Sequence, residues 1–198
     1  ETLANADQPQ GLNLAGAALF GLKDEKGEIA AARAELEKDA ENPEKWIALG
    51  RLQDSFLRYR EAIDTYSSGL AKFPQDWRFL RYRGQRQISL RQFGAAVRDL
   101  EQARSASKKA YEVAYYLGLA YYFSGDFDQA AREFARCEDQ MKNPLPVEED
   151  LKGQISCEGA REDQALIVPL QYWRYLALRR AGKIADAKTY AEGVSPLW

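Results

Sequence analysis

The chain has 198 residues, with 28 basic and 30 acidic side chains and no histidine. Without histidine it cannot form a Ser-His-Asp triad, a Cys-His pair or a histidine-ligated zinc site, and two cysteines are too few for a four-thiolate metal site. The net charge of −2 gives no overall attraction to nucleic acid or to an anionic membrane. We therefore expect no metal and no cofactor, and no apolar run reaches the roughly 20 residues of a membrane span.

The first residue is Glu1 rather than methionine. Removal of a signal peptide would explain this start and would make the protein an exported one, either periplasmic or extracellular. A start trimmed in another way would say nothing about the compartment, and both explanations stay open.

Residues 13–42 predict a degenerate leading hairpin. A turn at residues 23–27 precedes Ile29, Ala32 and Leu36, which share one face of a helix. The pattern is weaker here than in the residues that follow.

Three clear repeats come next, with a period of about 34 residues, a length typical of stacked helical repeats. Residues of the same kind recur at this spacing in several series, among them Gly50, Gly84 and Gly118; Ala62, Ala96 and Ala130; and Tyr66, Leu100 and Phe134. Several series that keep one register are hard to attribute to chance. We predict three helix hairpins, at residues 43–76, 77–110 and 111–144.

Each repeat predicts two amphipathic helices. In the first repeat Trp46 and Gly50 fall on one face of the first helix, Ala62 and Tyr66 fall on one face of the second, and Pro74 ends the pair. A glycine inside a helix costs about 1 kcal/mol relative to alanine. Its recurrence therefore indicates that another helix approaches closely at this point.

These residues match the pattern W-x2-L-G-x2-Y, then A-x3-F, then P. The matching positions are Trp46, Leu49, Gly50, Ala62, Tyr66 and Pro74 in the first repeat, and Leu117, Gly118, Tyr121, Ala130 and Phe134 in the third. The three repeats together resemble the tetratricopeptide repeat (TPR) family. The resemblance implies an all-α fold, a right-handed α-solenoid of antiparallel helix hairpins, in which the first helix of each hairpin lines a concave groove.

An insertion interrupts the array after the third repeat. The spacing of Gly182, Ile184 and Ala187 matches that of Gly125, Phe127 and Ala130, but the match lies further along the chain than one repeat length. This offset predicts a final hairpin at residues 167–194 after an inserted long loop at residues 145–166. We expect a single domain over residues 1–198. The array reaches Trp198 without the polar cap that usually closes a helical repeat, which favours a continuing chain or self-association through this end.

Cys137 and Cys157 are the two cysteines of the chain. They could pair in an oxidising compartment. We favour two unpaired thiols. The distance between the two α-carbons decides between a disulfide and two unpaired thiols.

The groove is where we expect a partner to bind. Removing the packing positions from the first helices leaves the candidates for partner binding, which are Arg51, Arg78, Arg81, Gln85, Tyr115, Leu119, Tyr122, Phe123 and Tyr172. Exposed aromatic clusters are typical of binding surfaces, although the insertion or the last hairpin could cover these aromatics as internal core. Residues 77–110 carry nine basic and two acidic side chains, which favours an acidic partner, unless these arginines pair with neighbouring repeats.

We predict a non-enzymatic scaffold that binds a protein or peptide partner in the groove. One alternative is nucleic-acid binding through the basic second repeat, where Trp77 and Tyr82 lie among arginines; the acidic flanks argue against it. A less favoured alternative is a glycosidase-like enzyme that uses two carboxylates, drawn from Asp126 and Asp128 or from residues 148–150. We expect no catalytic residues, and no binding of nucleic acid.

Overall fold

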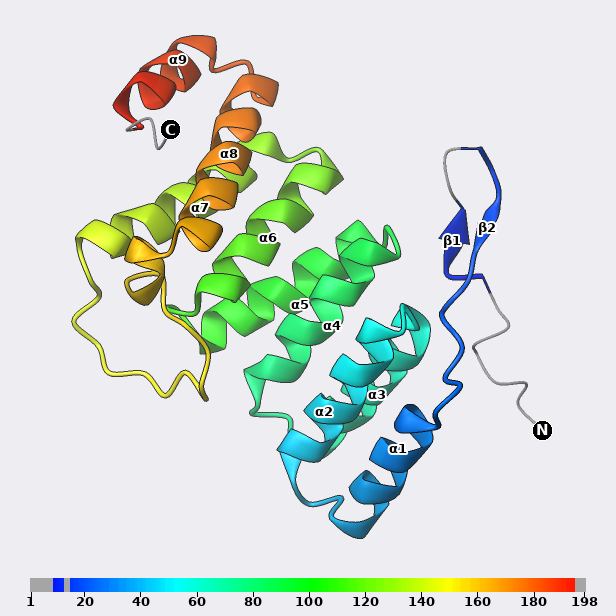
Figure 1. Ribbon diagram of the computed structural model, residues 1–198. Coiled ribbons are helices and arrows are strands. Elements are labelled where there is room, and N and C mark those ends of the chain that lie inside the picture. Colours follow the sequence, from blue (N-terminus) through cyan, green and yellow to red (C-terminus); the bar gives the residue numbers. More distant parts are fainter. Residues whose placement is uncertain (1–8, 13–14, 195–198) are drawn as a thin grey trace. The chain divides into compact units, whose positions relative to one another are not determined.

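The structure is a computed structural model that describes residues 9–12 and 15–194 (Figure 1). Its helices are α1 (Glu28–Lys38), α2 (Pro43–Ser55), α3 (Tyr59–Lys72), α4 (Trp77–Ser89), α5 (Phe93–Ala106), α6 (Tyr111–Ser124), α7 (Phe127–Lys142), η2 (Gly159–Glu162), α8 (Gln164–Arg180) and α9 (Ile184–Gly193). Two short strands, β1 (Gly11–Leu12) and β2 (Ala18–Leu19), pair antiparallel. The predicted all-α solenoid of helix hairpins is confirmed.

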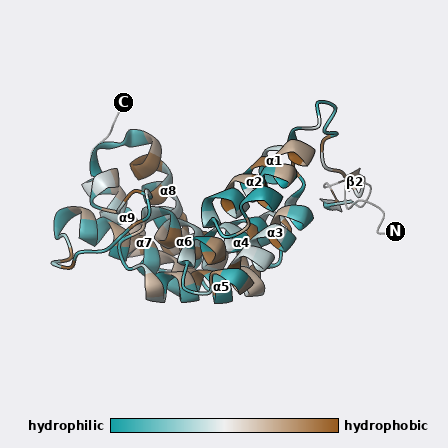
Figure 2. Cartoon of the chain, turned by 90° about the horizontal axis from the view of Figure 1, so that it is seen from below, coloured by the Kyte–Doolittle hydropathy of each residue, from teal (hydrophilic) through white to brown (hydrophobic). Residues whose placement is uncertain are grey.

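The chain forms two compact units, residues 1–99 (unit 1) and residues 100–198 (unit 2), and the boundary falls inside α5. The single domain expected from the sequence stays a prediction. In unit 1, α1 packs on α2, α2 on α3, and α3 on α4; in unit 2, α6 packs on α7, α7 on α8, and α8 on α9. Figure 2 shows hydrophilic and hydrophobic residues side by side on the same helices, as expected for amphipathic helices that bury one face.

Side-chain caps start the helices where the sequence places a small acceptor before them. The Asn42 side chain accepts a hydrogen bond from the backbone N–H of Glu44 (3.0 Å), and Pro43 occupies the first turn, where its missing N–H has no cost. Asp163 caps α8 in the same way, through the backbone N–H of Ala165 (2.9 Å). Because these signals are local, the hairpin boundaries can be read from the sequence.

The mid-helix glycines allow the two helices of a hairpin to approach closely. A Cβ placed on Gly50 would lie 2.2 Å from the ring of Tyr66, and a Cβ placed on Gly118 would lie 2.4 Å from the ring of Phe134. Both rings are fully buried. No larger side chain fits at either glycine unless the aromatic ring moves.

The turns inside the hairpins differ between the units. In four hairpins one residue of the turn after the first helix adopts a left-handed conformation. It is Leu57 (φ 56°) or Arg91 (φ 59°) in unit 1 and Gly125 (φ 87°) or Gly182 (φ 77°) in unit 2. Glycine adopts this conformation without steric cost, whereas an L-residue with a Cβ pays roughly 1–2 kcal/mol.

We therefore expect Arg91→Gly to stabilise the protein. Relief of the left-handed conformation outweighs the greater backbone entropy of glycine in the unfolded chain, for a net gain of about 0.5–1 kcal/mol. Chemical unfolding in urea measures the change. Arg98→Gly is the matched control, because Arg98 lies inside α5 and the same substitution there should destabilise by about 1 kcal/mol. A loss of stability in Arg91→Gly would contradict the assignment of strain.

The leading segment differs from the predicted hairpin at residues 13–42. It contains one helix, α1, preceded by the β1–β2 pair, while residues 13 and 14 lie outside the described residues. Gly16 and Gly27 adopt positive φ values, and none of the described residues before α1 is helical. The carboxylate of Asp24 then accepts hydrogen bonds from the backbone N–H groups of Glu28 and Ile29 (2.7 and 2.9 Å) and starts α1.

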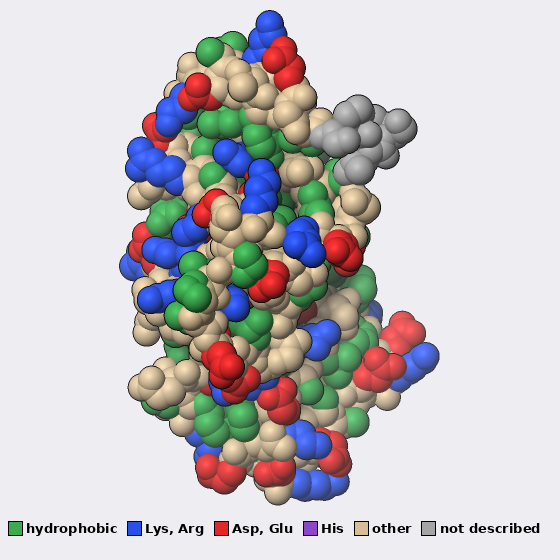
Figure 3. Space-filling model, turned by 90° about the vertical axis from the view of Figure 1, so that its left-hand side faces the viewer, with side chains coloured by type: hydrophobic (Ala, Val, Ile, Leu, Met, Phe, Trp, Pro, Cys, Tyr) green, Lys and Arg blue, Asp and Glu red, His purple; other side chains and the backbone are tan. Residues whose placement is uncertain are grey.

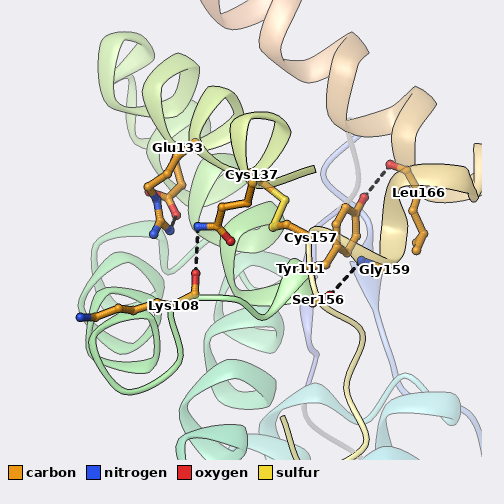
Figure 4. The surroundings of a disulfide bond; sticks show 10 residues. Lys108, Tyr111, Glu133, Cys137, Ser156, Cys157, Gly159 and Leu166 are labelled. Atoms are coloured by element: carbon orange, nitrogen blue, oxygen red, sulfur yellow. Dashed lines mark hydrogen bonds and ion pairs between the residues drawn. A yellow bond between two sulfur atoms is a disulfide. The ribbon is translucent and has the colours of Figure 1, made fainter. Parts of the chain in front are cut away.

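A disulfide joins Cys137 of α7 to Cys157 of the insertion, with 5.3 Å between the α-carbons (Figure 4). The preference for two unpaired thiols is therefore wrong. The reason is that the insertion folds back on the start of α6: Cys157 donates its backbone N–H to the carbonyl of Lys109 (2.8 Å), and the carbonyl of Ile155 accepts from Tyr111 (3.0 Å). These bonds hold Cys157 against α7, which sequence spacing does not reveal.

Polar contacts fix the rest of the insertion. The carboxylate of Glu149 accepts hydrogen bonds from the Ser107 hydroxyl and from the backbone N–H of Lys108. The hydroxyl of Tyr111 donates to the carbonyl of Leu166 (2.6 Å), which ties the start of α8 to α6. The insertion ends in the short helix η2, and α8 begins at Gln164, slightly before the start of the predicted final hairpin.

Candidate partner-binding surfaces

Arg78, a predicted groove residue, is buried and paired. Its guanidinium contacts the carboxylate of Asp76 (2.7 Å) and that of Glu44 (2.6 Å), and only 6% of the residue is exposed. Asp76 also caps α4 through the backbone N–H of Arg78. The charge of Arg78 is thus compensated inside unit 1. This agrees with the alternative expectation, in which these arginines pair with neighbouring repeats and not with an acidic partner.

Arg81 and Gln85 are also occupied by contacts within unit 1. The guanidinium of Arg81 lies 3.7 Å from the ring centre of Tyr82 and donates to the side-chain oxygen of Gln85 (3.3 Å). Arg81 is buried and Gln85 is partly buried. Arg51 is the one exposed member of the predicted set in unit 1.

Four of the nine basic side chains of the second repeat lie against carboxylates. Arg83 pairs with Asp99 (2.6 Å), Arg86 lies near Asp54 (3.6 Å), and Arg104 lies near Glu133 (3.7 Å), in addition to Arg78. On the face drawn in Figure 3, basic and acidic side chains are interspersed with hydrophobic ones. These four arginines are therefore not part of an unpaired basic surface.

Asp54 of α2 is a buried carboxylate with an elevated pKa. One oxygen accepts a hydrogen bond from the hydroxyl of Tyr66 (2.8 Å), and the other lies 3.6 Å from the guanidinium of Arg86, too far for a hydrogen bond. Burial raises the pKa of Asp54 from 3.8 to about 6, against the opposing effects of Arg86 and Tyr66. Compared with the unfolded chain, the folded state therefore favours the neutral form of the Asp54 carboxyl.

This pKa predicts how stability changes with pH. Because the pKa of Asp54 is higher in the folded state, its protonated form stabilises the fold below about pH 4, and this contribution is lost as the pH rises through about 6. Asp54→Asn keeps a neutral acceptor for Tyr66, so we expect it to match the wild type near pH 4 and to be about 2 kcal/mol more stable near pH 7.5. Urea unfolding across this range measures the difference, with the exposed Asp186→Asn as control. A difference that does not vary with pH would contradict the prediction.

In unit 2, two of the predicted residues belong mainly to the packing between helices. Leu119 is buried. Tyr115 is half-buried, with its ring stacked on that of Tyr111 (5.7 Å between ring centres) and tilted against that of Phe134 (6.3 Å). Leu119 and Tyr115 therefore follow the alternative expectation, in which the aromatic and apolar residues of this helix are covered as internal core.

The other three predicted residues of unit 2 come together in one aromatic cluster, made of Tyr122, Phe123, Phe127, Tyr172 and Trp173. The ring of Trp173 lies at its centre, with its ring centre 5.1 Å from that of Tyr122, 5.6 Å from that of Phe123 and 5.9 Å from that of Tyr172. Tyr122 also packs edge-on against Phe127 (5.2 Å). The cluster joins the end of α6, the start of α7 and the middle of α8.

The aromatic cluster is only partly covered. The last hairpin shields Tyr122 through Trp173, yet Phe123 remains 41% exposed and Tyr172 57% exposed. Both rings pack on Trp173 and remain partly open to water. Exposed aromatic patches of this kind often mark interaction sites.

Two exposed arginines lie at the end of α8, and one of them contacts the aromatic cluster. The guanidinium of Arg180 lies 4.7 Å from the ring centre of Phe127, and that of Arg179 donates to the hydroxyl of Tyr175 (2.9 Å). Both are exposed, and neither forms an ion pair within residues 9–12 and 15–194. The nearest basic neighbour in sequence, Lys183, pairs instead with Asp128 (2.5 Å).

Sequence reasoning missed Trp173 and Phe127 as members of this surface. Trp173 is adjacent to the predicted Tyr172, but only the packing of α8 on α6 and α7 shows that both rings belong to one cluster. Phe127 recurs at the repeat spacing with Tyr59 and Phe93, and it was not among the predicted binding residues.

Three of the carboxylates considered for catalysis have structural partners. Asp126 caps α7 by accepting from the backbone N–H of Gln129 (3.2 Å), Asp128 pairs with Lys183, and Glu149 holds the insertion. Within the described residues there is no group of three His, Cys, Asp or Glu side chains that could hold a metal ion. No helix in the described part of the chain is long and apolar enough to span a membrane.

Comparison with known proteins identifies the class of fold. Neither models of protein families nor curated protein sequences match this chain. Solved structures do: the MamA protein has a TM-score of 0.65 at 17% identity, covering 84% of this chain and 79% of that one. YrrB, described as a TPR protein with an unusual peptide-binding site, has a TM-score of 0.61 at 14% identity and covers 82% and 72% of the two chains.

A third similar structure is the Sgt2 TPR domain from Aspergillus fumigatus, with a TM-score of 0.54 at 20% identity over 79% of this chain and 85% of that one. The chain therefore has a TPR-like fold, and the resemblance found in the three sequence repeats is confirmed. At these identities the likeness concerns the fold, and function has to be argued from the surface.

Proposed function

We propose that this protein is a non-enzymatic scaffold that binds a protein or peptide partner, and that the aromatic cluster of unit 2 is part of its binding surface. The observation that carries the proposal is the exposure of Phe123 and Tyr172 beside Trp173. Aromatic side chains supply much of the binding energy at protein interfaces, because burying one removes a large apolar area from water.

The two arginines at the end of α8 support a partner with acidic groups. Arg179 and Arg180 carry charges that no carboxylate within the described residues compensates. A partner segment with a large apolar side chain next to a carboxylate would complement both features. In this proposal the segment lies along the first helices of the last two hairpins, α6 and α8, as the sequence predicted for the groove.

The alternatives have less support. The arginines of the second repeat that would contact phosphate are largely paired with carboxylates, as Arg78 and Arg83 illustrate. The acids that would act in a glycosidase serve as a helix cap, an ion pair and an anchor for the insertion. The disulfide between Cys137 and Cys157 supports an oxidising compartment, in keeping with export.

The test is partner capture with a double variant, Phe123→Ala with Tyr172→Ala. Proteins retained by the tagged wild type are identified by mass spectrometry, and the strongest candidate is purified and titrated. Losing two exposed rings should weaken its binding by at least tenfold, because each truncation at an interface hot spot costs about 1–2 kcal/mol.

The matched control is Val147→Ala, which removes an apolar side chain of similar exposure (48%) from the insertion, outside the aromatic cluster and outside α6 and α8. It should bind the partner as the wild type does. Equal affinity of the double variant and the wild type, at unchanged thermal stability, would exclude the aromatic cluster as the binding surface.

A further inference from the structure

Unit 1 contains an apolar cavity of about 360 Å³ between the β1–β2 pair and the turns that follow α2 and α4. Its apolar walls are Leu12, Leu19, Phe20, Leu57, Tyr59 and Leu90. Several of these side chains remain open to solvent, with Leu12 59% and Phe20 52% exposed. A cavity of this size with mostly apolar walls and few polar groups is typical of a site for a small ligand.

The two strained turns of unit 1 face this cavity. Leu57 and Arg91 both line it, and both hold a left-handed conformation that the corresponding turns of unit 2 give to Gly125 and Gly182. Non-glycine residues in this conformation cost free energy, and they concentrate at functional sites. A glycine at either turn would relieve the strain but would remove a side chain from the cavity wall.

Arg91 is the only charged side chain among the described residues that line the cavity. It is exposed, and it forms no ion pair with any described residue. The cavity thus combines an apolar interior with one uncompensated positive charge.

The wall formed by the β1–β2 pair is anchored to the rest of unit 1. The side-chain oxygen of Gln10 accepts from the backbone N–H of Arg60 (3.0 Å), and the backbone N–H of Leu22 donates to the carbonyl of Phe56 (2.7 Å). These contacts hold both ends of the strand pair, so the cavity is largely formed before a ligand arrives.

The chemistry of the walls distinguishes between ligands. A peptide would bring backbone N–H and C=O groups against apolar walls, and the groups that it buried there would lose water without gaining a hydrogen bond, at a cost in free energy. An alkyl chain requires no hydrogen bonds from the walls. A single anionic head group matches the single cation.

We propose that this cavity binds an amphiphile with one alkyl chain and one carboxylate, with the chain against the leucines and the carboxylate paired with Arg91. The proposal does not depend on the aromatic cluster, which lies in unit 2. The first prediction is a chain-length series from butanoate to dodecanoate, measured by calorimetry below micelle formation. Affinity should rise about fourfold per methylene until the cavity is filled, from about 0.8 kcal/mol for each buried CH₂.

Two variants separate binding from folding. Arg91→Gly and Leu57→Gly relieve strained turns, so both should fold at least as well as the wild type, and thermal unfolding verifies this. Arg91→Gly should weaken dodecanoate binding by about two- to fivefold, since Arg91 is exposed and an exposed ion pair contributes up to about 1 kcal/mol. Leu57→Gly should weaken it severalfold, whereas Arg33→Ala, at an exposed arginine of α1 outside the cavity, should leave it unchanged.

Dodecyltrimethylammonium, with the same chain and the opposite charge, should bind more weakly than dodecanoate. Equal binding of the two amphiphiles would overturn the proposal, as would wild-type affinity in both turn variants. A third arm uses an acetylated hexapeptide of alternating glutamate and leucine. If this peptide bound and dodecanoate did not, the surface would be a polypeptide site and the proposal would be wrong.

Discussion

Replacing Cys137 and Cys157 by alanine is expected to destabilise unit 2 by about 3 kcal/mol. The disulfide joins two cysteines at a sequence separation of 20, and a cross-link over this length lowers the entropy of the unfolded chain by roughly that amount. For a chain of this size the melting temperature should fall by roughly 6–12 °C. Differential scanning calorimetry measures the change.

The expected damage is local, because the disulfide is one of several anchors of the insertion. Amide hydrogen exchange should accelerate at residues 145–158, while α2 and α3 of unit 1 should exchange as in the wild type. A reducing agent should lower the melting temperature of the wild type by the same amount and leave the double variant unchanged. If mass spectrometry found the bond intact and its reduction did not alter the melting temperature, the stabilising role of the disulfide would be refuted.

Gly118→Ala is expected to destabilise the protein by about 2 kcal/mol, although alanine favours the helix by about 1 kcal/mol. The new methyl group would lie 2.4 Å from a ring atom of Phe134, which is fully buried and cannot move aside without displacing its neighbours. Phe134→Ala should cost still more, about 3–5 kcal/mol, through loss of apolar contact and the cavity left behind.

A double-mutant cycle tests the close contact directly. Phe134→Leu shortens the side chain that Gly118→Ala would touch, so the double variant should be more stable than the sum of the two single changes predicts, by about 1 kcal/mol. Gly94→Ala is the control: a methyl group there meets only the end of Arg98 at 3.8 Å, and it should be neutral or stabilising. Additive effects within about 0.4 kcal/mol would refute the predicted clash.

The positions of the hairpins follow from the amino-acid sequence, because the contacts that define them are local. Gly50 meets Tyr66, and Gly118 meets Phe134, at the same sequence separation inside one hairpin. Caps such as Asn42 and Asp163 lie next to the helices that they start. The period of the repeats therefore predicted the helix pairs and the fold class.

The candidate surfaces could be predicted only in part. The periodicity selected Phe123 and Tyr172 as outward-facing residues, and both are exposed. It selected Arg78 by the same rule, yet Glu44 and Asp76 occupy that guanidinium. A helical period states which way a residue points, but not which charge on another helix will meet it.

Long-range contacts were decided by the tertiary structure alone. Cys157 reaches Cys137 because the insertion folds back on α6, and Trp173 completes the aromatic cluster because α8 packs on α6 and α7. Burial and pairing depend on which elements meet in space. A repeat pattern encodes only the neighbours inside its own period, so the sequence specified the hairpins, and their packing determined which side chains are left for a partner.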